Sequence, residues 1–181
     1  GGRLDSTNVL NPIQTIITPI AFDHSDILGK TIEEIAFEKG GIIKSRIPLI
    51  LAKQKPVVKK ILLNIAKQKN SSVITCNNSS VKTTAQITTS TKFYINGIPF
   101  YTPLKGYHQG MNAVTSVVSI NHFDPKIPKE VIQNGLSNVF WPGRLQQMDT
   151  IKPIYYDVAH NAHGIHTILH MFRSWWKKKP I

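Results

Sequence analysis

The first 80 residues alternate between short apolar runs and longer segments in which apolar residues recur every three or four positions. Residues 13–20, 47–52 and 72–75 are rich in β-branched residues and predict three buried strands. Residues 56–68 carry apolar residues at helical spacing with lysines between them, and a capping-box pattern starts another helix over residues 31–39. The order strand, helix, strand, helix, strand predicts a parallel sheet covered by helices.

The pattern changes after residue 90. Two short apolar runs flank Asn96-Gly97, a strong short-range signal of a β-hairpin, and predict an antiparallel insertion or edge. Beyond it, the spacing predicts two helices and then, after a break at residues 141–143, one strand and one helix, over residues 109–120, 128–136, 153–158 and 162–176. We therefore expect an α/β protein, with residues 1–143 forming one domain and residues 144–181 the beginning of a second.

Composition narrows the class of protein. An apolar fraction of 41% supports a packed core, whereas a disordered chain has fewer apolar residues and more charge repulsion. The single cysteine, Cys76, excludes a disulfide within the chain, and no apolar run approaches the length of a membrane span. The sequence shows no charged-then-apolar leader, so we expect a cytoplasmic protein that binds no membrane.

The formal net charge is +12, with 22 lysines and arginines against 10 acidic residues. Such a balance attracts polyanions, including nucleotides, polycarboxylates and nucleic acid, but does not choose among them. A nucleic-acid-binding module is one alternative, and it requires aromatic residues interleaved with clustered basic residues on one surface. Trp175-Trp176 before the terminal lysines is the only such feature, so we expect no nucleic-acid partner.

A phosphate-binding motif near residue 30 is incomplete. Gly29-Lys30-Thr31 resembles the end of a P-loop, but His24 holds the position of that motif's first glycine. Glycine is needed there because the loop curls its backbone amides around phosphate oxygens. Lys30 and Thr31 are better explained as a loop lysine and a helix cap.

Six segments together carry a far more specific signal. They read GGRLDSTN, DHSDILG, EKGGIIK, HQGMNA, PGRL and DVAHN, at residues 1–8, 23–29, 38–44, 108–113, 142–145 and 157–161. In this order and spacing they closely resemble the bacterial folylpolyglutamate synthase/dihydrofolate synthase enzymes, members of the Mur ligase superfamily. The resemblance covers essentially the whole chain.

The resemblance implies a fold and an activity. The fold is most of a Mur-ligase-type central ATPase domain, with a parallel sheet, helices and an antiparallel hairpin insertion, followed by the start of a Rossmann-like C-terminal domain. The activity is ATP-dependent addition of L-glutamate to folates, and to dihydropteroate, through an acyl phosphate. That chemistry uses ATP and Mg²⁺, which neutralises phosphate charge and holds the reactants in line.

Two residues match the family's metal site. His24 matches the metal-binding histidine and follows a predicted strand, at the sheet edge where ligands of parallel sheets collect. Lys39 matches the lysine that becomes carbamylated, and a carbamate supplies an anionic oxygen suited to Mg²⁺. Residue type alone suggests instead a locally hydrogen-bonded histidine and a solvated helix-end lysine. The family usually has alanine after this lysine, and we expect Gly40 in its place to loosen the helix end.

Five further residues match binding positions of the family. Asn112, Arg144 and Asp157 match the residues that hold ATP. Arg144 would offer a fixed cationic fork to phosphate, and Asp157 an acceptor for the nucleotide or its ribose. Without the family match, Asn112 is typical of an amide on a helix surface, Arg144 of an ion pair in a linker, and Asp157 of a cap at the end of a strand. Leu4 and Asp5 match the loop near the pterin-bearing substrate.

The family pattern also predicts regions beyond this chain. We expect a P-loop, preceded by an acidic metal ligand, upstream of Gly1, and most of a C-terminal domain after Asp157, so that the chain is truncated at both ends. Two hypotheses remain open. One is a split enzyme with a separately encoded N-terminal half, and the other is an inactive remnant of a broken gene. An adjacent reading frame encoding the P-loop half would favour the split enzyme.

Overall fold

The computed structural model describes residues 2–22, 28–77, 79–82, 91–148, 151–152 and 154–175. The chain forms two compact units, one of residues 1–77 with 118–125 and the other of residues 78–117 with 126–181. The helix α4 (Tyr107–Phe123) contributes residues to both units. The predicted domain boundary at residue 143 stays a prediction.

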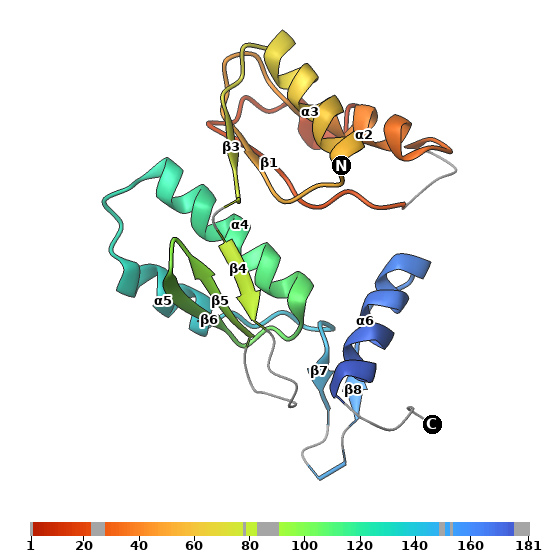
Figure 1. Cartoon of the computed structure of the whole chain (residues 1–181), viewed down its shortest axis with the longest axis vertical. Helices are drawn as coiled ribbons and strands as arrows, with labels where there is room; N and C mark the ends of the chain where they lie inside the picture. Colours follow the sequence, from red (N-terminus) through yellow and green to blue (C-terminus); the bar gives the residue numbers. More distant parts are fainter. Residues whose placement is uncertain are drawn as a thin grey trace. The chain divides into compact units, whose positions relative to one another are not determined.

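The first unit is a three-stranded parallel sheet with two helices (Figure 1). The strands β1 (Thr15–Ile17), β2 (Leu49–Leu51) and β3 (Val73–Thr75) lie side by side in chain order. The helices α2 (Ile32–Gly40) and α3 (Pro56–Gln68) connect successive strands, as parallel pairing requires. The predicted parallel arrangement is therefore confirmed.

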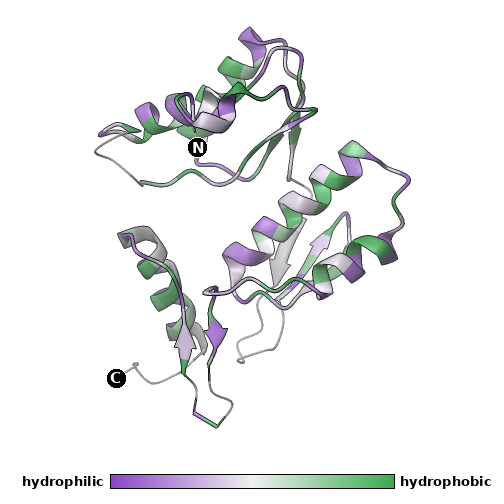
Figure 2. Ribbon diagram, turned by 180° about the vertical axis from the view of Figure 1, so that it is seen from behind, coloured by the Kyte–Doolittle hydropathy of each residue, from purple (hydrophilic) through white to green (hydrophobic). Residues whose placement is uncertain are grey.

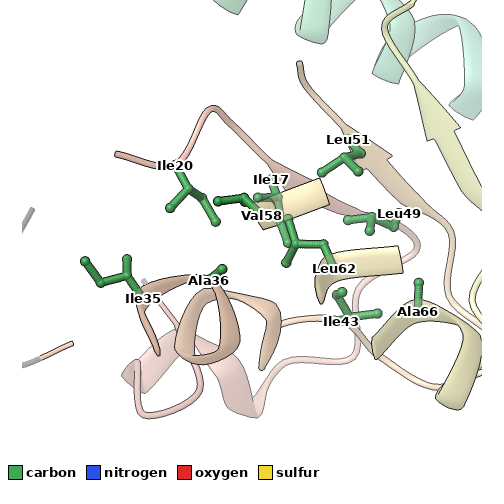
Figure 3. Packing of buried hydrophobic residues seen from close by; sticks show 10 residues of the cluster. All are labelled: Ile17, Ile20, Ile35, Ala36, Ile43, Leu49, Leu51, Val58, Leu62 and Ala66. Carbon is green, nitrogen blue, oxygen red and sulfur yellow. The ribbon is translucent and has the colours of Figure 1, made fainter. Parts of the chain in front are cut away.

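A cluster of ten buried residues forms the core of this unit. Figure 3 shows them pointing toward one another, and they are Ile17, Ile20, Ile35, Ala36, Ile43, Leu49, Leu51, Val58, Leu62 and Ala66. Both helices contribute to the cluster, and hydrophobic and hydrophilic residues alternate along them (Figure 2). Complete burial of one large aliphatic side chain stabilises a fold by about 1.5–3 kcal/mol, so this cluster is the main source of the unit's stability.

Local signals in the sequence set the starts of both helices. The Thr31 hydroxyl accepts a hydrogen bond from the Glu34 amide at 3.2 Å, and the Glu34 carboxylate accepts one from the Thr31 amide at 3.1 Å. This capping box was predicted and is confirmed, and Thr31 is a helix cap. Pro56 stands at the first position of α3, where its missing N–H leaves no helical bond unmade.

The first strand is shorter and less buried than its pattern predicted. Only Thr15–Ile17 of the expected residues 13–20 is strand, and Ile13 and Ile16 are 67% and 41% exposed. Among the described strands β1 pairs with β2 alone, so it is an edge of this sheet. Alternate side chains of a strand point to opposite faces, which places Ile16 away from the core that buries Ile17.

The second unit contains an antiparallel sheet in the order β4 (Ser79–Lys82), β5 (Thr91–Ile95) and β6 (Ile98–Thr102). Asn96 and Gly97 have φ angles of 49° and 79°, the left-handed values of the turn that Asn-Gly favours, so the predicted hairpin is confirmed. The sequence did not predict β4, because its residues Ser-Ser-Val-Lys are mostly polar and show no strand pattern.

The remaining elements follow in chain order. The helix α5 (Lys129–Ser137) covers the outer edge of β6, where the Gln133 side-chain amide both donates to and accepts from the backbone of Tyr101 at 3.0 Å. A short antiparallel pair, β7 (Gln146–Gln147) with β8 (Tyr155–Tyr156), then leads to α6 (Ala162–Trp175). The strand predicted near residue 155 is therefore present, but its partner β7 was not predicted.

Candidate functional site

Lys39 lies in the last turn of α2, beside the carboxyl end of β1. Its side chain is half-buried. It borders a cavity of about 230 Å³ whose walls are Ile16, Ile17, Thr18, Pro19, Ile20, Lys39 and Ile42. This is the edge of a parallel sheet at which ligands collect. His24 lies outside the described residues, so its predicted proximity to Lys39 stays a prediction.

Two glycines end α2, and each meets a different neighbour. A Cβ atom on Gly40 would lie 2.5 Å from Cδ1 of Ile65, the movable tip of a side chain on α3. A Cβ atom on Gly41 would lie 2.5 Å from Cβ and 2.7 Å from Cα of Arg3, which cannot move without the backbone. Gly40 is buried against α3 and allows close helix packing, while the predicted loosening of the helix end stays a prediction. Gly41 lets the N-terminal segment lie directly against that end.

Side chains tie the N-terminal segment to the end of α2. The Arg3 amide donates to the Glu38 carbonyl at 2.8 Å, and the Arg3 guanidinium pairs with the Glu38 carboxylate at 3.2 Å. The Asn8 side-chain amide donates to the carbonyls of Arg3 and Gly41 at 3.0 and 3.3 Å, and the Lys44 ammonium donates to the Asn8 carbonyl. Sequence reasoning assigned no role to these contacts, although the residues belong to the motifs GGRLDSTN and EKGGIIK. The two motifs are two sides of one local structure.

Leu4 and Asp5 precede the short 3-10 helix η1 (Ser6–Val9), and the Leu4 side chain is 81% exposed. The Asp5 carboxylate caps η1 by accepting hydrogen bonds from the hydroxyl and the backbone amide of Thr7, the latter at 2.9 Å. These bonds, that of the hydroxyl first, lower the pKa of Asp5 to about 2. Asp5 is therefore an anion at neutral pH.

A larger cavity of about 760 Å³ lies between this loop and α2. Its walls combine apolar and charged side chains. The apolar ones are Leu4, Leu28, Phe37 and Ile61, and the charged ones are the carboxylates of Asp5, Glu33, Glu34 and Glu38 and the guanidinium of Arg3. The volume falls in the range of pockets for small molecules, about 300–1,000 Å³. Leu4 and Asp5 therefore border a cavity of a size that small molecules can occupy.

In the second unit, Asn112 lies on α4 with its side chain exposed. Its amide donates to Oε1 of the buried Gln109 at 3.4 Å, and its neighbours Met111 and Ala113 are buried. Asn112 therefore stands on the solvent side of a helix whose other face is packed. It is placed where a ligand can reach it.

Arg144 and Asp157 are brought together through the backbone. One Asp157 carboxylate oxygen accepts from the Leu145 amide at 2.9 Å, and the other accepts from the Ala159 amide at 2.8 Å. The Val158 amide adds a hydrogen bond to the Gly143 carbonyl at 2.9 Å. These contacts agree with the strand-end cap that residue type alone suggested for Asp157. They hold the loop of Arg144.

The side chain of Arg144 itself is exposed, and it forms no hydrogen bond or ion pair with another residue in the described part of the chain. The linker ion pair suggested by its residue type is therefore not formed among these residues. Four residues after Asp157, in the motif DVAHN, the Asn161 side chain accepts from the Gly164 amide at 2.8 Å and caps the start of α6.

Within the ranges that the structure describes, no three His, Cys, Asp or Glu side chains are grouped so that they could hold a metal ion. A carbamate on Lys39 would add an anionic oxygen that the unmodified lysine lacks. None of the helices in these ranges has both the length and the hydropathy needed to cross a membrane.

The fold and the site together define an α/β protein with a candidate reactive lysine beside the carboxyl end of a parallel strand. Residues 2–120 match the Mur ligase middle domain. This chain belongs to the Mur ligase family.

Comparison with individual proteins confirms the resemblance drawn from the six motifs. The chain is 36% identical over 178 residues to the dihydrofolate synthase/folylpolyglutamate synthase of Bacillus subtilis, covering 91% of this chain and 41% of that protein. It is similar in structure to Mycobacterium tuberculosis folylpolyglutamate synthase complexed with ADP and AMPPCP, with a TM-score of 0.84, 31% identity and coverage of 97% and 42%. A folylpolyglutamate synthase complex with AMPPCP and folate gives a TM-score of 0.86, 26% identity and coverage of 98% and 46%. The chain spans less than half of each of these proteins.

Proposed function

We propose that this chain is part of an ATP-dependent ligase that adds L-glutamate to folates, and to dihydropteroate, through an acyl phosphate. The observation that carries the proposal is the Mur ligase match over residues 2–120, on a chain whose relatives are named for this activity. ATP and folate are proposed ligands because solved relatives hold ATP analogues and folate. L-Glutamate is the proposed second substrate.

Lys39, in carbamylated form, and His24 are proposed to hold Mg²⁺. The cavity beside Lys39 offers room for the added carboxylate, at the carboxyl end of β1. Carbamylation joins the lysine nitrogen to the carbon of carbon dioxide and releases a proton, which leaves an anionic oxygen ligand. When bound, Mg²⁺ would neutralise charge on the transferring phosphate.

Asn112, Arg144 and Asp157 are proposed to contact ATP. The exposed guanidinium of Arg144 has no partner among the described residues, while the carboxylate of Asp157 holds its loop in place. Each carboxylate oxygen can accept a second hydrogen bond, so Asp157 can also receive a ribose hydroxyl. Leu4 and Asp5 are proposed to border the pterin-bearing substrate, in the larger cavity.

A separately encoded N-terminal half is the proposed protein partner. The assay that tests this proposal expresses the chain with and without the N-terminal region of the Bacillus subtilis relative and measures ATP- and glutamate-dependent product by mass. We expect no turnover and weak ATP binding by the chain alone, because three side chains cannot replace the backbone amides of a phosphate loop. The co-expressed pair is expected to be active.

Lys39→Ala should abolish that activity, since alanine cannot carry a carbamate, whereas Lys60→Ala on the exposed side of α3 should leave it unchanged. Turnover by the chain alone, or activity that survives Lys39→Ala, contradicts the mechanism. A folded but inactive pair favours the alternative of an inactive remnant. A carbamate signal in carbon-13 NMR with labelled bicarbonate, lost in Lys39→Ala, tests the modification independently of activity.

A further inference from the structure

The Gln54 side chain joins the loops that follow β1 and β2. Its amide nitrogen donates to the Thr18 carbonyl at 2.9 Å, and its amide oxygen accepts from the Ile20 amide at 2.9 Å. Just before this point the Ala52 amide donates to the Ile17 carbonyl at 3.0 Å, which continues the backbone pairing of the two strands. A side-chain amide offers the same donor and acceptor as a peptide group, so Gln54 extends this pairing past the ends of the strands.

Three constraints fix the backbone of residues 18–20. Pro19 has a fixed φ angle and restricts the residue before it to extended backbone. The Ile20 side chain is 5% exposed and points into the core cluster of the unit (Figure 3). The third constraint is the pair of bonds from Gln54, one on each side of Pro19. Because Gln54 is not a member of the core cluster, a substitution can remove this constraint without removing a core side chain.

This segment forms most of the wall of the cavity beside Lys39. Among the described residues, seven line that cavity of about 230 Å³, and five of them belong to residues 16–20. The other two are Lys39 itself and Ile42, just beyond the end of α2. A carboxylate added to Lys39 would therefore meet mainly the segment that Gln54 holds.

We infer that Gln54 is a positioning residue for the carbamate of Lys39. It keeps residues 18–20 in one place, so that the cavity keeps one shape and the carbamate one orientation. A metal ligand must be held to about half an ångström, and a wall that is free to move does not provide that precision. The inference rests on the proposed function, which makes Lys39 a carbamylated metal ligand. Gln54 acts through the wall, and sequence reasoning assigned it no role.

Carbon-13 NMR of the full chain, titrated with labelled bicarbonate, tests the inference. Gln54→Ala removes both bonds and should raise the bicarbonate concentration that gives half of the maximal carbamate signal about five-fold, the equivalent of one typical hydrogen bond. Gln54→Glu keeps an acceptor for the Ile20 amide and loses the donor to Thr18. Its half-maximal concentration should therefore lie between those of the wild-type chain and of Gln54→Ala.

Gln133→Ala is a matched control from the second unit. The Gln133 side-chain amide also donates to one backbone carbonyl and accepts from one backbone amide, both of Tyr101, at 3.0 Å. Its loss should leave the carbamate titration unchanged. Amide hydrogen exchange verifies that each substitution has released its own segment, because the Ile20 amide should exchange faster in Gln54→Ala and the Tyr101 amide in Gln133→Ala.

Equal half-maximal concentrations for the wild-type chain and Gln54→Ala would overturn the inference and leave the proposed function standing. A wild-type chain without a carbamate signal would overturn the proposed role of Lys39 and the inference with it. Should Gln54→Ala not fold, Gln54→Glu carries the same comparison, and a titration equal to that of the wild-type chain would again contradict the inference.

The co-expressed ligase separates positioning from binding. Gln54→Ala should lower kcat about ten-fold and keep the KM for ATP and for glutamate within about two-fold, because a misplaced metal ligand slows the chemistry without removing a substrate contact. An active pair whose kcat survives Gln54→Ala would contradict the positioning role. An inactive pair in which Gln54 still sets the carbamate titration would remove the proposed function and leave the positioning of Lys39 standing.

Discussion

The two parts of the chain that carry candidate site residues hold them by different means. Lys39 ends a helix whose inner face belongs to a ten-residue core, and side chains tie that end to the N-terminal segment. Arg144 and Asp157 lie in residues 142–175, where the buried hydrophobic side chains among those described are Leu145 and Met171. Backbone hydrogen bonds to one carboxylate hold that loop.

The difference matches the demands of the two proposed roles. A metal ligand must be held to about half an ångström, and a packed core with locked rotamers provides such precision. An arginine side chain that binds phosphate can remain exposed to solvent, provided that hydrogen bonds of the backbone hold its loop in place. Because local stability follows buried apolar contacts, we expect the first region to open rarely and residues 142–175 to open at a lower free energy.

The largest expected effect is the loss of core packing. Leu62→Ala removes a completely buried side chain between α3 and the sheet, and should lower the free energy of unfolding of the first unit by about 3 kcal/mol. Met171→Ala, at 7% exposure on α6, should cost about 2 kcal/mol and affect mainly residues 142–175. Urea unfolding, with hydrogen exchange to locate the change, measures both. An equal or larger cost for Met171→Ala would remove the contrast between the regions.

The two glycines at the end of α2 provide a matched pair of variants. Gly41→Ala should destabilise the first unit by about 2 kcal/mol, because the new methyl group meets the backbone of Arg3. Gly40→Ala should cost less than about 1 kcal/mol, since Ile65 can rotate and alanine favours the helix. Thermal unfolding compares them, and exchange of the Arg3 amide reports release of the N-terminal segment. Similar costs for the two variants would show that this contact does not anchor the segment.

A smaller and local effect is expected at Asp157. Asp157→Ala leaves the amides of Leu145 and Ala159 without their acceptor, which should cost about 1–2 kcal/mol. Both amides should exchange faster, while Glu130→Ala on α5 leaves them unchanged. Asp157→Asn keeps one acceptor oxygen, so its amide exchange rates should lie between those of the wild-type chain and of Asp157→Ala. Unchanged exchange in Asp157→Ala would mean that the loop of Arg144 is held by other contacts.

The smallest effect concerns pH. The pKa of Asp5 is lowered from 3.8 to about 2 by its bonds to Thr7, so the ionised group favours the folded chain. This contribution is complete above about pH 4 and is lost as the pH falls toward about 2. Asp5→Asn should therefore bring a small loss of stability at pH 7 that vanishes near pH 2, as measured by urea unfolding. A difference that persists at the lowest pH would exclude ionisation of Asp5 as its cause.

Local patterns in the sequence predicted much of the fold. The capping box at Thr31, the turn at Asn96-Gly97 and the helix over residues 56–68 depend on neighbours within a few positions, and the structure has all three. The family was predicted as well, because its motifs are short and stand in a fixed order. The roles of the candidate residues that match those motifs remain proposals.

Contacts between distant residues were decided by the tertiary structure alone. Gly41 must be small because Arg3 lies against it, and the Asp157 carboxylate meets an amide 12 positions earlier in the chain. The exposure of Ile16 follows from the place of β1 at an edge, and the larger cavity exists because the N-terminal loop folds against α2. Hydrophobic spacing and capping signals specify the helices and the tight turn, since the hydrogen bonds of these elements form within a few residues. They do not specify which surfaces meet, since that depends on the packing of side chains far apart in the chain.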